Sequence, residues 1–325
     1  MRVLVTGGAG YIGSVVTREL LASGHEVVVF DNLCTGHRAA VPAATPLVLG
    51  DTRDITLLQQ TFSQHDTEAV IHMAAISQVG TSVVDPRAYF ENNVGGALSL
   101  FGAMLDCGIH RLVFSSTAAV YGEPDSMPIT ELAATRPTSP YGDSKLVIET
   151  VLSRYDAAYG LRSACLRYFN AAGAVPDAGE DHRPETHLVP LLLDVAAGKR
   201  ADIAVFGTDY PTPDGTCVRD YIHVADLARA HVLALDAIDS GSRTYNLGCG
   251  GGFSVAQVVE AVRRITGHAV PVRVAPRRAG DPAELVASSA RITAELGWMP
   301  EHPSIDAIVQ SAWDWRRANP NGYGQ

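Results

Sequence analysis

Long hydrophobic runs and paired cysteines are both missing from this sequence of 325 residues. No apolar run approaches the roughly 18 residues that a membrane-spanning helix requires, so we expect no membrane association. The five cysteines are scattered and none forms a Cys-x-x-Cys pair, which argues against a disulfide framework and a structural zinc site. The N-terminal apolar stretch is too short for a signal peptide, and a reducing cytoplasm is the simplest location.

Positive charge is also scarce, because 25 Lys and Arg face 35 Asp and Glu, for a net charge of −10 with neutral His. A net acidic chain is poorly suited to binding nucleic acid or an anionic membrane through bulk charge, so neither is expected as a partner. An anionic small substrate remains possible, since a local group of arginines can outweigh the global sign. The 46% hydrophobic content is typical of a globular protein with ample material for a core.

Short apolar runs alternate with amphipathic stretches of helical length in the first half of the chain. The pattern predicts strands near residues 3–5, 26–30, 46–49, 69–72 and 111–115, with helices over 12–23 and 54–64. Such alternation favours an α/β fold built on a Rossmann-type, doubly wound parallel sheet. After about residue 170 the loops lengthen. We therefore expect a larger domain over residues 1–170 and a smaller C-terminal α/β domain over 171–325, with later chain crossings returning to the first.

A glycine-rich turn follows the first predicted strand and opens the first predicted helix. Gly7, Gly10 and Gly13 satisfy G-x-x-G-x-x-G, and their backbone could approach a pyrophosphate beside the helix N-terminus. Asp31 ends the second strand, where a carboxylate accepts hydrogen bonds from ribose hydroxyls and repels a 2′-phosphate. The motif therefore predicts NAD rather than NADP. Asp51, after the third strand, could reach the adenine or cap the next helix, and the sequence leaves both open.

A tyrosine and a lysine, Tyr141 and Lys145, lie four residues apart, so on a helix they would share one face. A nearby ammonium favours phenolate, which lets a tyrosine act as a base although its ordinary pKa is about 10. Ser115 and Thr117 belong to a hydroxyl cluster that ends another apolar strand, and ligands bind at the carboxyl ends of parallel strands. Thr117 could hydrogen-bond a substrate hydroxyl together with Tyr141, or it could simply form a turn.

Together these motifs resemble the extended short-chain dehydrogenase/reductase family, and several further blocks are similar to its nucleotide-sugar epimerases. The blocks are spread over nearly the whole chain: DNL (31–33), NNV (92–94), SPYG (139–142), RYFN (167–170), GTCVRDYIH (215–223) and PRRAGD (276–281). The resemblance implies reversible inversion at C4 of UDP-galactose and UDP-glucose through a transient 4-keto sugar, with NAD tightly bound. It also implies a homodimer, formed through helices around residues 85–107 and 141–159.

The resemblance assigns three catalytic roles. Tyr141 would be the base, Lys145 would bind the nicotinamide ribose and lower the pKa of Tyr141, and Thr117 would position the 4-hydroxyl of the sugar. The implied cofactor-binding residues are Gly7, Gly10, Tyr11, Ile12, Gly13, Asp31, Asn32, Asp51, Thr52, Met73, Ala74, Ala75, Ser77, Asn92, Ser115, Tyr141, Lys145 and Phe169. The implied substrate-binding residues are Thr117, Tyr141, Asn170, His187, Leu188, Ala204, Phe206, Arg219, Arg278, Asp281 and Leu285.

Taken singly, each of these arginines could form a surface ion pair and Phe206 could lie in a core. As an ordered set they favour a site for a nucleoside diphosphate, because the planar guanidinium suits paired phosphate oxygens.

Three positions depart from the family pattern. Ser77 stands where many epimerases carry lysine, so one cofactor contact is lost or replaced by water. His187 stands where some relatives carry asparagine, and it could donate to the diphosphate or simply lie on the surface. Leu285 stands at the position that limits the size of the C2 substituent, where some relatives carry tyrosine. Because leucine is smaller than tyrosine, some tolerance of N-acetylated UDP-hexoses is expected.

Several alternatives stay open at this point. A 4,6-dehydratase of the family would carry Asp-Glu after Thr117, whereas this chain has Ala118 and Ala119. Another nucleotide-sugar epimerase would act on UDP-N-acetylglucosamine or on a uronate, and the sequence reveals no cation for a sugar carboxylate. A non-catalytic NAD-binding scaffold would have lost Tyr141 or Lys145. His182 and His187 are expected to lie too far apart to share a metal, so no metal site is predicted.

Overall fold

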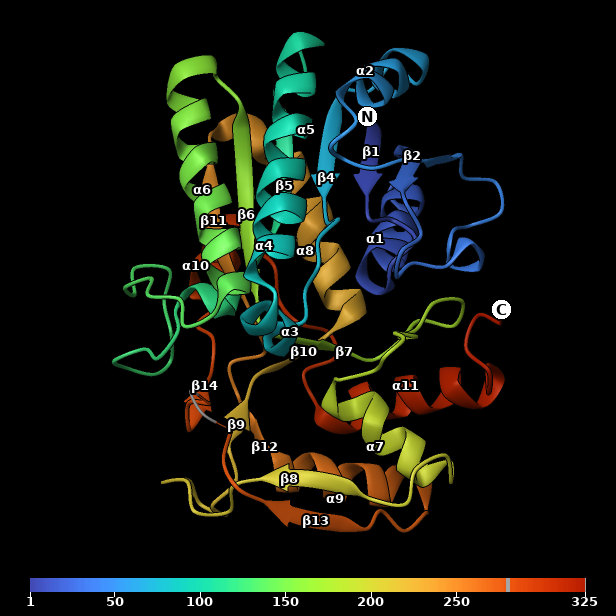
Figure 1. Cartoon of the computed structure of the whole chain (residues 1–325), viewed down its shortest axis with the longest axis vertical. Helices are drawn as coiled ribbons and strands as arrows, with labels where there is room; N and C mark the ends of the chain where they lie inside the picture. Colours follow the sequence, from blue (N-terminus) through green and yellow to red (C-terminus); the bar gives the residue numbers. More distant parts are fainter. Residues whose placement is uncertain (279–280, 325) are drawn as a thin grey trace.

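A parallel sheet forms the centre of the fold in the computed structural model, which describes residues 1–278 and 281–324 (Figure 1). Within those residues seven strands pair in one sheet, and every neighbouring pair is parallel. This order confirms the predicted Rossmann-type, doubly wound sheet. In spatial order the strands are β11 (Arg243–Leu247), β6 (Arg162–Tyr168), β5 (Arg111–Thr117), β4 (Ala69–His72), β1 (Arg2–Thr6), β2 (Glu26–Asp31) and β3 (Leu47–Leu49).

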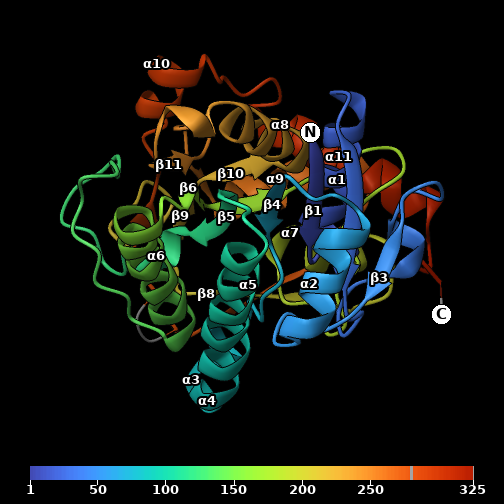
Figure 2. The ribbon, with the colours of Figure 1, turned by 90° about the horizontal axis from the view of Figure 1, so that it is seen from above.

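Helices cover both faces of the large sheet, as Figure 2 shows. One face packs against α1 and α8 through an apolar cluster that includes Val16 and Leu227, and the other packs against α2, α5 and α6 through a cluster that includes Leu58 and Leu152. Strands covered on both faces read as near-continuous apolar runs, which is why the sequence pattern located them. The helices are α1 (Tyr11–Ala22), α8 (Val224–Asp236), α2 (Ile55–Gln64), α5 (Gly95–Asp106) and α6 (Pro140–Tyr159).

Shorter elements connect and flank these layers. They are α3 (Val79–Val84), α4 (Pro86–Tyr89), a π-helical turn (Phe90–Val94) that leads into α5, and α10 (Ala290–Leu296) beside β11, with 3₁₀ turns at Arg38–Ala40, Ala118–Val120 and Ile238–Ser240. Among the described helices, none is both long enough and apolar enough to cross a membrane.

A smaller part of the molecule lies beyond the carboxyl ends of β1, β2 and β4 (Figure 1). Its helices share an apolar core that includes Leu192, Val262 and Ile308. The chain returns to the large sheet through α8 and β11, so it crosses between the two parts more than once; the boundary at residue 170 stays a prediction. The elements are α7 (Leu188–Ala196), α9 (Val255–Thr266) and α11 (Ile305–Ala318), with paired strands β7 (Asn170–Ala172) and β10 (Tyr221–His223), β8 (Ile203–Phe206) and β13 (Val272–Ala275), and β9 (Val218–Arg219) between β12 (Phe253–Ser254) and β14 (Glu284–Leu285).

A buried aspartate between β9 and β10 joins segments that are distant in sequence. The Asp220 carboxylate accepts hydrogen bonds from the backbone N–H groups of Cys249, Gly250 and Ala287, at 2.7, 3.0 and 3.0 Å. The first two amides lie just after β11 and the third just after β14. One side chain therefore fixes the loop that leaves the large sheet against the small sheet that carries Arg219.

We expect Asp220→Ala to lower the free energy of unfolding by about 3 kcal/mol or more, because each buried N–H left without a partner costs about 1–3 kcal/mol. Urea denaturation followed by circular dichroism measures this loss. Asp125→Ala, at an exposed loop position, is the control and should stay within about 0.5 kcal/mol of the native protein. Equal stability of the two variants would show that Asp220 does not hold these segments together.

Candidate active site

The glycine turn between β1 and α1 is shaped for close backbone contact. Gly7 has a φ of +71°, which L side chains rarely adopt, and a Cβ on Gly13 would lie 2.1 Å from the Gly7 carbonyl oxygen. The first turn of α1 has neither a side-chain cap nor an acidic residue, so its backbone N–H groups are available to an anion. These residues therefore fit the pyrophosphate of a dinucleotide, as the motif predicts.

Asp31, the last residue of β2, lies directly beside this turn. Its buried carboxylate accepts hydrogen bonds from the N–H groups of Ala9, at 3.0 Å, and Leu33, at 2.8 Å. Burial raises the pKa of Asp31, while the two N–H donors act in the opposite direction. A carboxylate has about four lone-pair positions, so this one retains capacity for the hydroxyls of a ribose.

Asp51 illustrates a choice that the sequence left open. Its carboxylate pairs with Arg53, whose Nη2 lies 2.6 Å away, and this contact lowers the pKa of Asp51. The residue that caps α2 is Asp54, whose side chain accepts from the N–H of Leu57 at 3.0 Å. The capping alternative for Asp51 is therefore wrong, and its expected position near an adenine stays a prediction.

Other residues of the predicted cofactor set follow the carboxyl ends of the strands. A Cβ on Gly7 would lie 2.7 Å from the Ala74 nitrogen, so the loop that leaves β4 runs against the glycine turn. The rest of the set is distributed as follows: Tyr11 and Ile12 at the start of α1, Asn32 after β2, Thr52 before α2, Met73, Ala75 and Ser77 after β4, Asn92 in the π-helical turn, Ser115 in β5, and Phe169 between β6 and β7.

The three predicted catalytic residues meet where β5 ends and α6 begins. Ser139 caps α6 by accepting from the Gly142 N–H at 3.2 Å, which sets the start of the helix and places Tyr141 and Lys145 on one buried face. Thr117 ends β5, and its hydroxyl is near enough to the Tyr141 phenol to lower the pKa of that phenol. The Thr117 hydroxyl accepts from the backbone N–H of Ala119 at 3.1 Å, so Thr117 does form a turn, and its contact with a substrate hydroxyl stays a prediction.

Burial dominates the titration of Tyr141 and Lys145. It raises the pKa of Tyr141 well above the ordinary value, although the hydroxyl of Thr117 acts in the opposite direction. Burial also lowers the pKa of Lys145 to about 7, despite the attraction of Glu149. Lys145 donates to the Ser115 carbonyl at 2.8 Å. Burial therefore favours the neutral phenol of Tyr141, contrary to the lowering of its pKa expected from Lys145.

A buried ion pair, which sequence reasoning missed, lies next to Lys145 on α6. Glu149 lies one turn beyond Lys145 on α6, and its Oε2 is 2.5 Å from Nη2 of Arg167 on β6. Ser116 donates to Glu149, and Arg167 donates to the Tyr121 hydroxyl at 2.9 Å. An arginine directly after the apolar residues 164–166 was the available signal, because a buried charge requires a partner.

The predicted substrate residues of the C-terminal half form two contacts. The Arg278 guanidinium stacks over the Phe206 ring, 3.9 Å from its centroid. Arg219 Nη2 lies 3.0 Å from Asp281 Oδ1, and the strand register places Leu285 opposite Arg219. Ala204 lies in β8 as expected, and Asn170 begins β7 beside β10. Two residues of the PRRAGD block, 279 and 280, lie outside the described residues.

His187 precedes Leu188, the first residue of α7, and its side chain is exposed at the surface but paired with two carboxylates. Its Nδ1 lies 2.8 Å from Glu180 Oε1 and 2.9 Å from Glu185 Oε1. Burial alone would lower the pKa of His187, but hydrogen bonds to these two carboxylates outweigh it and raise the pKa to about 10. The histidine therefore carries a positive charge at neutral pH, which suits an anionic ligand on its other ring nitrogen.

The expectation that His182 lies far from His187 is wrong, because their ring centroids are 5.1 Å apart. The intervening loop turns sharply, since the Glu185 carboxylate accepts from the N–H groups of Thr186 and His187 at 2.7 and 2.8 Å. Against the effect of burial, hydrogen bonds to Glu180 and Glu185 raise the pKa of His182 to about 9. Spacing along the chain could not reveal this fold-back.

The chain belongs to the NAD dependent epimerase/dehydratase family, whose pattern matches residues 3–248. The UDP-glucose 4-epimerase of Lacticaseibacillus casei is 51% identical over 328 residues, covering 100% of this chain and 99% of that relative. Two solved structures are also similar. UDP-glucose 4-epimerase from Brucella ovis in complex with NAD is 47% identical, with a TM-score of 0.93 and coverage of 96% and 97%. The enzyme from Bifidobacterium longum in complex with NAD⁺ and UDP is 40% identical, with a TM-score of 0.94 and coverage of 99% and 100%.

We expect Gly13→Ala to reduce NAD retention roughly tenfold or more, the equivalent of about 1.4 kcal/mol, because the new Cβ would collide with the backbone of Gly7. The measurement is NAD released per chain when the purified protein is denatured. Gly102→Ala is the matched control, since a Cβ there meets no atom within 4 Å. Undiminished NAD in a folded Gly13→Ala variant would contradict the assignment of this turn to the cofactor.

Proposed function

We propose that this protein is an NAD-dependent epimerase that interconverts UDP-galactose and UDP-glucose by inverting C4. The observation that carries the proposal is the meeting of Thr117, Tyr141 and Lys145 at the sheet edge that also bears a dinucleotide-type glycine turn. A relative named UDP-glucose 4-epimerase, which is 51% identical over the full chain, supports the choice of substrate.

The proposed chemistry needs one acid–base group and one positioning hydroxyl. NAD, when bound, supplies a hydride acceptor that can later return the hydride. Tyr141 removes the proton of the C4 hydroxyl, while Thr117 orients that hydroxyl towards it. Loss of a proton and a hydride leaves a 4-keto sugar, whose planar C4 can be reduced from either face. Tyr141 then returns the proton to the C4 oxygen, so the substrate's atoms and charges balance over the cycle.

Burial makes the base action of Tyr141 conditional. The phenol stays protonated in the protein alone, so it can give up its proton only where a positive charge lies beside it. Lys145, with a pKa of about 7, supplies only part of that charge. The site therefore restricts proton removal to the enzyme that holds its cofactor in the oxidised, cationic form.

The sugar nucleotide would be held mainly through its UDP portion. We assign the diphosphate to Arg219 and Arg278, with Asn170 and His187 beside it, and the ribose to Asp281. Phe206 and Ala204 of β8, with Leu188 at the start of α7, would provide apolar surface for the uracil. Their contacts, Arg278 on Phe206 and Arg219 with Asp281, support a shared site. A firm grip on UDP leaves the hexose free to present either face of C4.

Three broader assignments are part of the proposal. Residues 1–170 would supply most of the NAD site and residues 171–325 most of the sugar-nucleotide site. The protein would be a homodimer, because apolar side chains are exposed on the α3–α6 side, namely Val83, Val84, Phe90, Leu98 and Val147. It would act in the cytoplasm, which suits its five free cysteines.

We expect Tyr141→Phe to lower kcat by about 10²–10⁴-fold, because it removes the acid–base group and leaves the ring in place. The assay is conversion of UDP-galactose to UDP-glucose with no NAD added, beside a measurement of bound NAD. Tyr159→Phe, exposed at the other end of α6, should retain full activity. Undiminished turnover by Tyr141→Phe would refute its role. A native protein that holds NAD but converts neither sugar would keep the cofactor assignment and overturn the substrate.

Leu285 yields a prediction about substrate choice. We expect the native protein to turn over UDP-N-acetylgalactosamine, and Leu285→Tyr to lower the ratio of N-acetylated to plain turnover roughly tenfold or more, because overpacking costs about 1–3 kcal/mol. Comparison of kcat/KM for the two substrates measures the ratio, and Leu285→Met is the control of similar volume. An unchanged ratio in Leu285→Tyr, or no N-acetyl turnover by the native protein, would remove Leu285 from the specificity site.

A further inference from the structure

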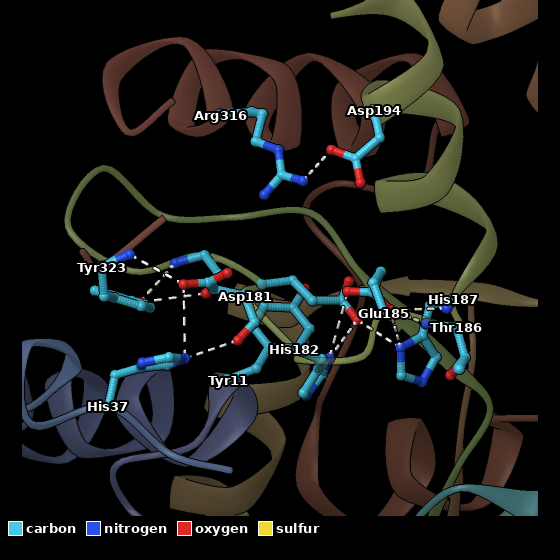
Figure 3. A network of polar contacts seen from close by, with 12 residues as sticks. Tyr11, His37, Asp181, His182, Glu185, Thr186, His187, Asp194, Arg316 and Tyr323 are labelled. Atoms are coloured by element: carbon cyan, nitrogen blue, oxygen red, sulfur yellow. Dashed lines mark hydrogen bonds and ion pairs between the residues drawn. The ribbon is translucent and has the colours of Figure 1, made fainter. Parts of the chain in front are cut away.

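Two histidines and two glutamates converge in the loop before α7, and most of them have no part in the proposed chemistry (Figure 3). We call Glu180, His182, Glu185 and His187 the His–Glu cluster. Each offers one ligand atom, and these atoms all lie within 4.8 Å of one another. The two carboxylates are largely buried, with side chains 8% and 12% exposed, so neither is an ordinary solvated surface acid.

The donor atoms are close enough together to be compared with those around a small divalent metal ion. His182 Nδ1 lies 3.1 Å from Glu180 Oε1 and 3.6 Å from Glu185 Oε2, and His187 Nδ1 lies 2.8 Å from Glu180 Oε1. Tetrahedral zinc, with bonds of about 2.0–2.2 Å, separates neighbouring donors by about 3.3–3.6 Å. An ion would move the closest donors, now 2.8 and 3.1 Å apart, away from each other and would draw together donors separated by up to 4.8 Å.

We propose that the His–Glu cluster is a metal site that takes zinc, with one ligand atom from each of its four residues. Two carboxylates and two neutral imidazoles carry a charge of −2, which one Zn²⁺ neutralises. Imidazole nitrogen favours zinc over magnesium and calcium, which prefer shells of oxygen ligands. The proposal does not depend on the epimerase reaction, because no step of that reaction passes through the ion.

The surroundings of the cluster hold its ligands in place. Glu185 Oε1 accepts from the backbone N–H groups of Thr186 and His187, which leaves Oε2 to face His182. The ring of Tyr11 packs edge-on against His182 with centroids 6.1 Å apart, and its hydroxyl donates to the Gly173 carbonyl at 2.6 Å. A bound ion would therefore fix the loop before α7 to the first residue of α1, beside the glycine turn.

Protons are the competing occupants of this site. Two imidazolium–carboxylate pairs also neutralise the cluster, and zinc must displace the protons from both Nδ1 atoms, so binding is best measured at mildly alkaline pH. A second group of potential ligands, Asp226, Glu301 and His302, carries no such proposal. The Asp226 carboxylate already accepts from the N–H groups of Glu301 and His302 and from Arg229.

The test is equilibrium dialysis of the full-length, NAD-loaded protein against Zn²⁺ at pH 8, with thermal unfolding of the same samples. We expect one high-affinity equivalent of zinc per chain and a raised Tm, with no rise in the same concentration of Mg²⁺. His182→Gln, which keeps a polar side chain and removes a ligand, should weaken zinc binding by about tenfold or more and abolish the rise in Tm. His110→Gln, at an exposed position, should behave as the native protein does.

His187→Gln provides a second ligand variant if His182→Gln fails to fold, as judged by retained NAD and circular dichroism. Absorption of the Co²⁺-substituted protein then identifies the ligand type, because the exposed thiols of Cys34 and Cys107 would add a thiolate charge-transfer band. A tetrahedral spectrum without that band supports the proposal. Zinc binding that is absent, unchanged in the ligand variants, or accompanied by the thiolate band would overturn it and leave the cluster as a pair of ion pairs. Epimerase activity, assayed separately, does not bear on these outcomes.

Discussion

The parallel direction of all the strands in the large sheet is the constraint on which the candidate site depends. Parallel strands place every carboxyl end on one edge, so loops that are far apart in sequence open onto the same space. The glycine turn, Asp31, the loop after β4 and Thr117 all leave strands at that edge. The sheet fixes the positions of these strand ends, and the side chains that follow each strand determine the chemistry of the site. The small sheets and their helices lie beyond the same edge (Figure 1).

Burial is the second constraint, and it acts on charge. Tyr141 and Lys145 are both withdrawn from water, which disfavours the ionised form of each and leaves their protonation open to control by whatever lies beside them. The structure tolerates charge at this depth where it is paired, as Glu149 and Arg167 show. The same principle operates in the loop before α7, where two carboxylates face two imidazoles. In both places, opposite charges are paired with each other.

Local patterns proved predictable and long-range pairings did not. The glycine turn, the strand ends and the Tyr141–Lys145 helix face each arise within a few residues, so periodicity and φ preference sufficed to locate them. The sequence left open whether Asp51 caps α2, and hydrogen-bond geometry assigns the cap to Asp54, three residues further on. The Glu149–Arg167 pair and the approach of His182 to His187 depend on strand register and loop folding, which composition and spacing do not encode. Roles for individual residues around the sugar nucleotide came from family resemblance, and the structure adds their contacts.

The packing of α8 against α1 has a consequence for how the chain matures. Residues 224–236 help to cover one face of a sheet in which an interior strand, β1, is the first element of the sequence. During synthesis, Val16 and its neighbours must wait for more than two hundred further residues before that face is covered. A product ending at residue 170 would display the uncovered apolar surface permanently, and it would also lack the edge strand β11. Fragments or fusions divided at residue 170 would therefore expose apolar surface and aggregate.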